Sequence, residues 1–493
     1  MKEPGPDSSW PRARVKRGGW NPFWAAGGRS PRASELVRWI SDEAGEEGAL
    51  LQALGIASAD ELFRDVPKKA RIGRMGVGAS REEPEVVAEV DKLLDRNRPL
   101  GRFASFLGGR VAYRYLPAAV DAIVSRSEFY TSYTPYQPEA SQGMLRALFE
   151  FQSLWVELSG LDVANASLYD GATAAGEALL LCRRIHEGQR FLIPASLPWE
   201  EKSVLANYAS GPGLVVEEIP YDPRTGLLDL EYVRSAVAQH DVFGVLADVP
   251  NGFGVLDEHL FELKPTIGDV PLVVVADPLA LTVLEPPGNY GADVVVGEGQ
   301  GFGIAPSFGG PLLGLFAVRR EHVRQAPGRI VGATVDTYGR PAYTLTLQTR
   351  EQHIRRSRAT SNICTNESLM ALAFVVYASV VGPRGLAALQ ASLAEKARTL
   401  ASALGSIDGL RTPRFDAPYL GEFTVELAKG SAAGLLDRLR RRRVLGGHPL
   451  ADPRPGAPSA PERILVAPSP AVTDKDVARY ASAAKSWAAE GAR

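Results

Sequence analysis

The chain has 493 residues, of which 45% are hydrophobic and 23% are charged, the ordinary balance for a globular protein of two or three domains. Its formal net charge of -2 argues against a nucleic-acid or membrane-surface partner, since such partners select a basic face. Two distant cysteines, six scattered histidines and the lack of an apolar run of roughly 20 residues argue against disulfides, a metal site and a membrane span. We therefore expect a cytoplasmic protein without a metal.

The first 100 residues differ in composition from the rest. Residues 1–34 are rich in Pro, Gly, Arg and Ser, and we expect a disordered leader, with ordering on a partner through its tryptophans as the alternative. Residues 35–100 predict a helical N-terminal segment, because apolar residues recur three and four apart. Ser58 followed by Glu61 is typical of a helix N-terminus within this segment.

Strands and helices alternate over residues 101–385, which we expect to form a large domain. Short β-branched runs such as "PLVVVADPLAL" and "GADVVVGEG" are separated by helical stretches, a pattern typical of a mostly parallel sheet buried on both faces. Residues 386–493 predict a smaller C-terminal α/β domain. Ligands of such sheets bind beyond the carboxyl ends of the strands, so we expect the site at the loops after "VVVAD" and "VVVGEG".

A large doubly wound domain followed by a small α/β domain is the plan of many pyridoxal-phosphate enzymes. That cofactor needs a lysine amine, an aspartate for its pyridine nitrogen and a helix N-terminus for its phosphate. Asp277 ends a predicted strand where the aspartate is expected, with a turn carboxylate as the alternative. The next strand leads to Gln300 where the lysine is expected, and an amide nitrogen cannot form an imine. Since no lysine lies between Lys264 and Lys396, we predict a cofactor-type domain without its covalent anchor.

Three further stretches have polar residues in suggestive positions. Asp170 opens a predicted helix that could hold a phosphate, but its own negative charge would repel one, so we expect it to cap the helix. The loop "RSEFYTSYTPYQPEASQG" clusters tyrosines with Gln and Glu between prolines, which suits a binding cleft, with an interface or a buried loop as the alternative. In "LTLQTREQHIRRSRATSNICTN", arginines could bind a carboxylate or pair with acidic side chains.

Long segments of the chain resemble one family. The tyrosine-rich loop, "LSGLDVANASLYDGATAAGEA", "YGADVVVGEGQGFGIAPSFGGP" and the "SNICTN" stretch are similar to the alpha subunit (subunit 1) of glycine dehydrogenase (decarboxylating), the P-protein of the glycine cleavage system. The resemblance covers residues from about 45 to 400. It implies an α/β fold of the pyridoxal-phosphate-dependent transferase type (fold type I, aspartate aminotransferase-like).

The resemblance also implies a reaction and its partners. Glycine would lose its carboxylate as CO2, and its aminomethyl group would pass to the lipoyl arm of H-protein. Pyridoxal phosphate would be held by the lysine of a beta subunit in an α2β2 assembly, and this chain would be inactive alone. No catalytic residue is expected here; Asp277 would be a remnant of the cofactor site. The residues that we expect to face the shared cleft are Tyr133, Tyr136, Gln137, Glu139, Ser361 and Asn362.

Some features depart from the family pattern and leave alternatives open. The leader is unusual, "GEGQGFGIA" replaces "GEGQPLGIP", and the C-terminal region matches loosely. These departures leave room for a paralogue that acts on a glycine analogue in a specialised pathway. A purely structural assembly subunit is a second alternative. A stand-alone pyridoxal-phosphate lyase or desulfurase is a third, and it would need a Schiff-base lysine.

Overall fold

The computed structural model describes residues 46–72, 76, 78–79, 81–130, 134–348, 352–454 and 460–491. The chain divides into two compact units, Met1–Arg96 and Asn97–Arg493. The predicted leader, residues 1–34, lies outside the described residues, and so does Tyr133. The predicted domain boundaries near residues 34, 100 and 385 stay predictions.

The first unit is helical over its described residues, as the apolar spacing predicts. Its helices are α1 (Glu46–Leu54), η2 (Ala59–Phe63), η3 (Lys68–Ala70) and α2 (Glu83–Leu94). Helix α2 has Glu83 and Glu85 in its first turn, where negative charge suits the helix dipole. Ser58 is the N-cap of η2, but its side chain makes no capping hydrogen bond. Instead the Glu61 carboxylate accepts a hydrogen bond from the Ala57 amide at 2.7 Å.

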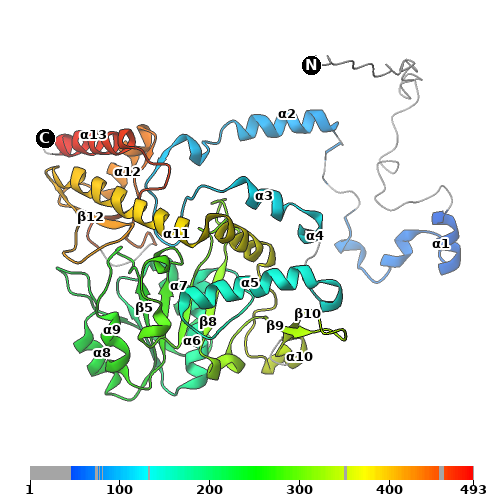
Figure 1. The fold of residues 1–493 in the computed structure, drawn as a ribbon. Helices are drawn as coiled ribbons and strands as arrows, with labels where there is room; N and C mark the ends of the chain where they lie inside the picture. Colours follow the sequence, from blue (N-terminus) through cyan, green and yellow to red (C-terminus); the bar gives the residue numbers. More distant parts are fainter. Residues whose placement is uncertain are drawn as a thin grey trace, which may run out of the picture. The chain divides into compact units, whose positions relative to one another are not determined.

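The second unit is built on a seven-stranded sheet with the order β2-β8-β7-β6-β5-β3-β4 (Figure 1). Its strands are β2 (Val163–Ala164), β3 (Arg190–Pro194), β4 (Val215–Ile219), β5 (Val242–Val249), β6 (Leu272–Ala276), β7 (Val294–Glu298) and β8 (Gly314–Val318). All pairings from β4 to β7 are parallel, whereas β8 is antiparallel to β7 and to β2. Strands β5 to β8 are buried along their whole length. The predicted, mostly parallel sheet is confirmed.

Helices cover both faces of this sheet. They are α5 (Gln142–Ser159), α6 (Gly171–Ile185), α7 (Trp199–Ser210), α8 (Leu230–Val237) and α9 (Leu260–Ile267). Before them in the chain come α3 (Ala118–Val124), which packs on the long helix α11 (Ser368–Gly405), and the short α4 (Ser127–Tyr130). Successive residues of a strand point to opposite faces, so Val273 and Val275 of β6 pack in a core with α6 and α7. Val274, between them, packs in the other core with Trp155 of α5 and with α8 and α9.

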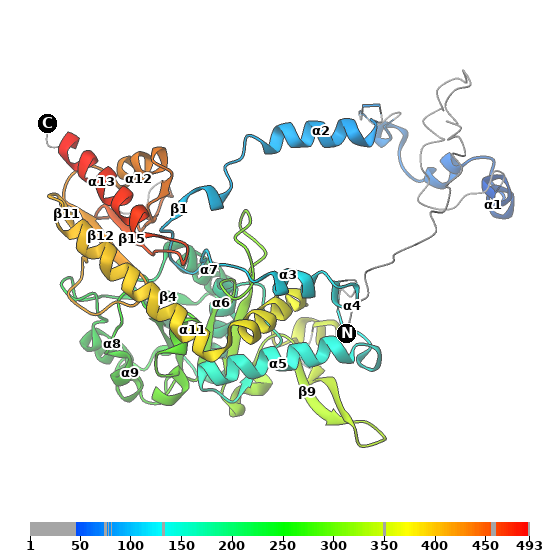
Figure 2. The ribbon, with the colours of Figure 1, turned by 45° about the horizontal axis from the view of Figure 1, so that its top comes forward.

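One long helix, α11 (Ser368–Gly405), contributes to this second core and to a smaller one. It is kinked at Gly382, where φ is 70° and ψ is 166°, just before Pro383. By length and composition alone it could cross a membrane. Here it runs beside α5, and both Phe374 and Leu400 are fully buried, as in the core helix of a globular protein (Figure 2).

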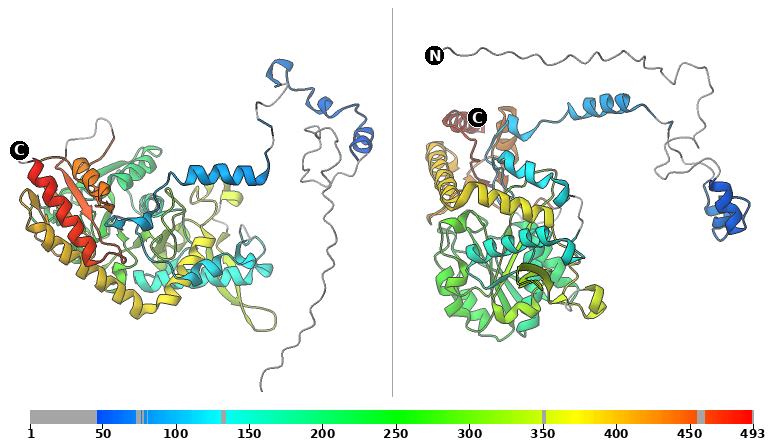
Figure 3. Two further views of the ribbon diagram at one scale, coloured as in Figure 1. Left: turned by 90° about the horizontal axis from the view of Figure 1, so that it is seen from above. Right: turned by 45° about the vertical axis from the view of Figure 1, so that its right-hand side comes forward.

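The smaller core is formed around an antiparallel sheet of order β11-β12-β15-β14. Its elements are β11 (Leu410–Arg411), β12 (Phe423–Leu427), α12 (Ala432–Arg441), β14 (His448–Pro449), β15 (Arg463–Val466) and α13 (Asp474–Gly491). Helix α13 lies along α11 (Figure 3). Strand β1 (Ala104–Ser105) pairs in parallel with β13 (Val444–Leu445). The rings of Phe106 and Tyr480 pack edge to face, with 5.1 Å between their centroids. Residues 104–106 therefore belong to the smaller core although they precede the large sheet in sequence.

The remaining described elements are short. They are η4 (Leu100–Arg102), η5 (Pro138–Ala140), η6 (Ala280–Thr282), η7 (Pro287–Tyr290), η8 (Arg320–Gln325), β9 (Ile330–Val335), β10 (Pro341–Thr346), α10 (Gln352–Arg355) and η10 (Arg356–Arg358). Strands β9 and β10 form an antiparallel hairpin.

Candidate functional site

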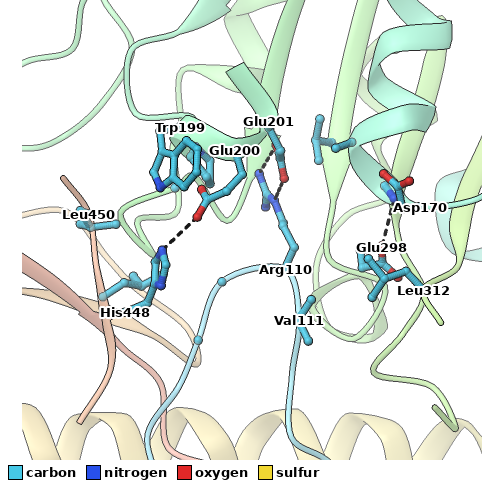
Figure 4. Close-up of a pocket in the computed structure, with 18 residues that line it drawn as sticks. Arg110, Val111, Asp170, Trp199, Glu200, Glu201, Glu298, Leu312, His448 and Leu450 are labelled. Carbon is cyan, nitrogen blue, oxygen red and sulfur yellow. Dashed lines mark hydrogen bonds and ion pairs between the residues drawn. The ribbon is translucent and has the colours of Figure 1, made fainter. Parts of the chain in front are cut away.

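Polar side chains gather where the central strands end. Asp248 is the penultimate residue of β5, and Asp277 directly follows β6. Glu298 is the last residue of β7 and lies two residues before Gln300. Because β5, β6 and β7 are parallel neighbours, these positions share one edge of the sheet, as the strand pattern predicts. A cavity of about 290 Å³ lies at this edge (Figure 4).

Gln300, at the position where the lysine is expected, is fully buried and held by two hydrogen bonds. Its Oε1 accepts a hydrogen bond from the Ala112 amide at 2.8 Å, and its Nε2 donates to the Ile304 carbonyl. Both ends of the amide are therefore used inside the protein. This residue has a structural partner on each side and no nucleophilic atom.

The N-terminus of α6 is already occupied by the protein's own carboxylates. Asp170 caps the helix, as predicted, and accepts a hydrogen bond from the Thr173 amide at 2.8 Å. The Glu298 carboxylate accepts hydrogen bonds at 2.9 Å from three backbone amides, those of Gly171, Gln300 and Leu313. Burial raises the pKa of Glu298 to about 7, although these three N–H groups favour its charged form. Two acidic groups at this helix end disfavour a bound phosphate.

Arg110 reaches the same edge from a loop and pairs with two buried carboxylates, of which Figure 4 shows Glu201. Its Nε lies 2.6 Å from Glu201 Oε1, and its Nη2 lies 3.0 Å from Asp248 Oδ2. The side chains of Arg110, Glu201 and Asp248 are 19%, 8% and 1% exposed. Burial raises the pKa of Asp248 to about 7, although the guanidinium favours its charged form.

The space in front of Asp277 is small. Asp277 lines two cavities: one, which Arg110, Arg114, Glu298 and Glu422 also line, measures about 30 Å³, and the other measures about 50 Å³. Each has room for a few water molecules at most. The Asp277 carboxylate accepts a hydrogen bond from the Leu279 amide at 2.9 Å, as a turn carboxylate does. Burial raises the pKa of Glu422 to about 7, while the Gly109 N–H, which donates to it at 3.0 Å, favours the charged form.

These residues do not fit a pyridoxal-phosphate site. The lysine position holds a hydrogen-bonded amide, the helix N-terminus is capped by Asp170 and Glu298, and the room at Asp277 is too small for a pyridine ring. A phosphate would meet carboxylates where the cofactor needs N–H donors. No reaction step on this chain alone follows from its geometry.

The larger cavity lies between the large sheet and the smaller core. At its edge His448 Nε2 lies 3.3 Å from Glu200 Oε1, and both side chains are partly exposed (Figure 4). The walls are mainly apolar and include Trp199, Leu312 and Leu450. The His448–Glu200 pair thus joins the smaller core to the first turn of α7.

The cleft residues predicted from the resemblance lie elsewhere on the surface. Tyr136 is 72% exposed, Gln137 and Glu139 are exposed at the start of η5, Asn362 is exposed, and Ser361 is half-buried. Within the described residues, none of these five lines the cavity of about 290 Å³. Tyr133 is outside the described residues.

The two predicted stretches are nonetheless anchored to one loop, residues 165–169. The Asn366 amide donates to the Ala166 carbonyl at 2.7 Å, and the Cys364 amide donates to the Tyr169 hydroxyl at 3.2 Å. Thr134, at the tyrosine-rich end, is hydrogen-bonded to Arg329, whose carbonyl accepts a hydrogen bond from the Ala166 amide at 2.7 Å. The "SNICTN" stretch is therefore bonded directly to the loop that leads to Asp170, and Thr134 is linked to that loop through Arg329.

Comparison with known proteins identifies the family. The sequence matches the family described as glycine cleavage system P-protein over residues 37–442. The chain belongs to this family. It is 42% identical over 448 residues to the probable glycine dehydrogenase (decarboxylating) subunit 1 of Geobacillus thermodenitrificans, covering 90% of this chain and 98% of the relative. It is 40% identical over 413 residues to the protein of the same name from Aeropyrum pernix, covering 81% and 89%. The predicted resemblance is confirmed.

Solved structures agree with this P-protein assignment. A crystal structure of glycine decarboxylase (P-protein) of the glycine cleavage system, in inhibitor-bound form, has a TM-score of 0.81 at 35% identity and covers 92% of this chain and 100% of that chain. The sphingosine-1-phosphate lyase of Burkholderia pseudomallei has a TM-score of 0.60 at 17% identity, covering 86% and 95%. The aspartate aminotransferase of Thermus thermophilus has a TM-score of 0.52 at 18% identity, covering 79% and 99%. The last two share only the fold, and the predicted fold class is confirmed.

Proposed function

We propose that this P-protein chain is the subunit of glycine decarboxylase that carries no cofactor. A beta-type partner subunit would hold pyridoxal phosphate on its own lysine, and the two chains together would form the active enzyme as an α2β2 assembly. The observation that supports this most is Gln300, buried and hydrogen-bonded at the position of the missing lysine. The relatives named subunit 1 imply a second subunit.

In this assembly the substrate would be glycine, and the products would be CO2 and an aminomethyl group on the lipoyl arm of H-protein. The assembled enzyme would be an oxidoreductase, a glycine dehydrogenase (decarboxylating). The chain would work in the cytoplasm and would be inactive alone. This chain would contribute substrate binding and the exclusion of water. It would not contribute the Schiff-base amine, because the hydrogen-bonded amide of Gln300 stands at the lysine position.

The tyrosine-rich loop and the "SNICTN" stretch would form the wall that this chain adds to the partner's cleft. Tyr133, Tyr136, Gln137, Glu139, Ser361 and Asn362 are the residues that we propose for it. The support is the combination of anchored backbone and exposed side chains: the Cys364 backbone amide donates to the Tyr169 hydroxyl, while Tyr136 is 72% exposed. Loops held by a rigid scaffold with free aromatic and polar side chains are typical of recognition surfaces.

Reconstitution tests the proposed function. The chain would be produced alone, with a beta-type partner, and the partner alone, and exchange of the glycine carboxyl group with bicarbonate would be measured with lipoylated H-protein present. We expect exchange only when both chains are present. Exchange by this chain alone, or borohydride-trapped pyridoxal phosphate on one of its lysines, would contradict the proposal.

Substitutions at the wall separate a cleft-forming role from a purely structural one. In the reconstituted enzyme we expect Gln137→Ala and Glu139→Ala each to lower kcat/KM by roughly tenfold or more, because each removes a polar contact to the cleft. Native mass spectrometry should show unchanged assembly. Glu231→Ala, at a carboxylate of α8 that is 82% exposed, is the matched control and should leave both measurements unchanged. Full activity of both wall variants would favour the assembly-only alternative.

A further inference from the structure

Residues Ala104–Ala112, which we call the strap, connect the smaller core to the edge of the large sheet. The strap begins as part of the smaller core: the Phe106 amide donates to the Leu445 carbonyl at 2.8 Å, and the Ala467 amide donates to the Phe106 carbonyl at 3.0 Å. Farther along, the Gly109 amide donates to Glu422 at 3.0 Å. Up to Gly109, these bonds tie the strap to the smaller core.

The other end of the strap is bound to the large sheet. The Ala112 amide donates to Gln300 at 2.8 Å, after β7. Between Gly109 and Ala112, the side chain of Arg110 extends to Glu201 at the start of α7 (Figure 4). It also reaches Asp248 of β5, and its Nη1 lies 3.5 Å from the Pro250 carbonyl. Arg110 is thus the charged contact that holds the strap across the edge.

The charges at this edge explain why the contact is an arginine. Glu201 and Asp248 are nearly inaccessible to solvent, so each needs a cationic partner or a proton. A planar guanidinium can donate to two carboxylates and a carbonyl at once from a fixed fork, whereas an ammonium group cannot match that geometry. Arg110 also lines the cavity of about 30 Å³ at Asp277.

We propose that Arg110 is an internal ligand: its guanidinium fills the position between Glu201, Asp248 and the Pro250 carbonyl, and it fixes the strap to the large sheet. The site defined by Glu201, Asp248 and the Pro250 carbonyl is a receptor for a guanidinium-type cation and rejects anions such as phosphate. These contacts belong to this chain alone, so the proposal does not depend on the partner subunit.

Chemical rescue tests the binding site. Arg110→Ala in the full-length chain should unfold at a lower temperature, and millimolar methylguanidinium chloride should restore at least half of the lost thermal midpoint. Methylammonium chloride and NaCl at equal concentration should not restore it. The wild-type chain should show no shift, because its own side chain occupies the site. Arg340→Ala, which removes an exposed arginine 2.8 Å from Asp336, is the matched control and should show no rescue.

Hydrogen exchange tests the fixing of the strap. In Arg110→Ala the amides of Gly109 and Ala112 should exchange at least about tenfold faster than in the wild type, since both are bonded on either side of the lost contact. The amide of Phe106, bonded within the smaller core, should keep its rate. Methylguanidinium should slow the two strap amides again.

Each result decides the proposal. Three outcomes would show that Arg110 does not fill a guanidinium site. Methylguanidinium could fail to stabilise Arg110→Ala, it could stabilise the wild type equally, or methylammonium could stabilise the variant as well as methylguanidinium does. If Arg110→Ala does not fold, Arg110→Lys provides the test, because it keeps the charge and loses the fork. The strap amides of Arg110→Lys should then exchange faster than those of the wild type, and unchanged exchange would overturn the proposal.

Discussion

Replacing Arg110 by alanine is expected to lower the free energy of unfolding by about 3–5 kcal/mol at pH 8, the range for breaking one side of a buried ion pair. The substitution removes both short contacts of the guanidinium, at 2.6 Å and 3.0 Å, and leaves Glu201 and Asp248 buried without their cation. Loss of side-chain packing adds to the effect, because the Arg110 side chain is only 19% exposed.

The loss of stability should depend on pH with a definite sign. Burial raises the pKa of Asp248 to about 7 even with Arg110 present, and removal of the guanidinium raises it further. A carboxyl group with a raised folded-state pKa contributes stability at low pH, and this contribution is lost as the pH rises through that pKa. The variant should therefore be closest to the wild type near pH 5 and fall farthest below it at pH 8.

Urea unfolding, followed by tryptophan fluorescence at pH 5 and pH 8, measures both parts of this prediction. Urea is preferred to guanidinium chloride because the guanidinium ion could enter the vacated site. Arg340→Ala serves as the control, since its ion pair is exposed and should contribute less than about 1 kcal/mol at either pH. If Arg110→Ala lost the same free energy of unfolding at pH 5 and at pH 8, Glu201 and Asp248 would not be the buried carboxylates that the substitution leaves unpaired.

The sequence predicted the fold well because burial on both faces leaves a strong signal. Each of the six apolar runs expected as strands forms one of the strands β3 to β8, and residues on both sides of β6 are buried. The kink in α11 was not predicted, although Gly382 and Pro383 mark it locally. The strand order of the small sheet was not predicted. Its strands are only two to five residues long, too short for a clear periodicity, and the C-terminal region matches the family only loosely.

The candidate site was predicted only where the signal is local. Gln300 and Asp277 follow directly from the strand pattern, and Asp170 from its place at a helix start. Arg110 was missed because its partners Glu201 and Asp248 are 91 and 138 residues away in sequence. No periodicity links such distant residues. A weak signal was available in the carboxylate near the end of an otherwise apolar strand, "VLADVP", which resembles "VVVGEG".

The residues predicted to face the shared cleft show a different limit. The resemblance located two stretches, one bonded directly to the loop at residues 165–169 and one linked to it through Arg329, but it says little about where single side chains point. Tyr136 and Asn362 are exposed on this chain, and an exposed side chain acquires a role only from what binds it.

Glu298→Gln is expected to remove part of the pH dependence of stability. Burial raises the pKa of Glu298 to about 7 from an ordinary value of 4.5, so ionising it in the folded protein costs on the order of 3 kcal/mol relative to the unfolded chain. By the sign rule for a raised carboxyl pKa, its contribution to the wild-type stability is present near pH 5 and is lost as the pH rises to 8. Glutamine does not titrate, so the difference in unfolding free energy between wild type and variant should change by about that amount between the two pH values.

The absolute stability of the variant depends on its hydrogen bonds. The Oε1 atom of Glu298 accepts from the amides of Gln300 and Leu313, which a glutamine oxygen can also do, whereas Oε2 accepts from the Gly171 amide. A glutamine NH2 group would face that last donor, which costs about 1–3 kcal/mol and makes the variant less stable than the wild type near pH 5. At pH 8 the lost ionisation penalty should offset this, and the two proteins should be similar. Glu157→Gln, at an exposed position of α5, is the control and should leave the pH profile unchanged. A wild-type profile that Glu298→Gln leaves unaltered would mean that Glu298 is charged throughout this range, and that the N-terminus of α6 holds its carboxylate more tightly than burial disfavours it.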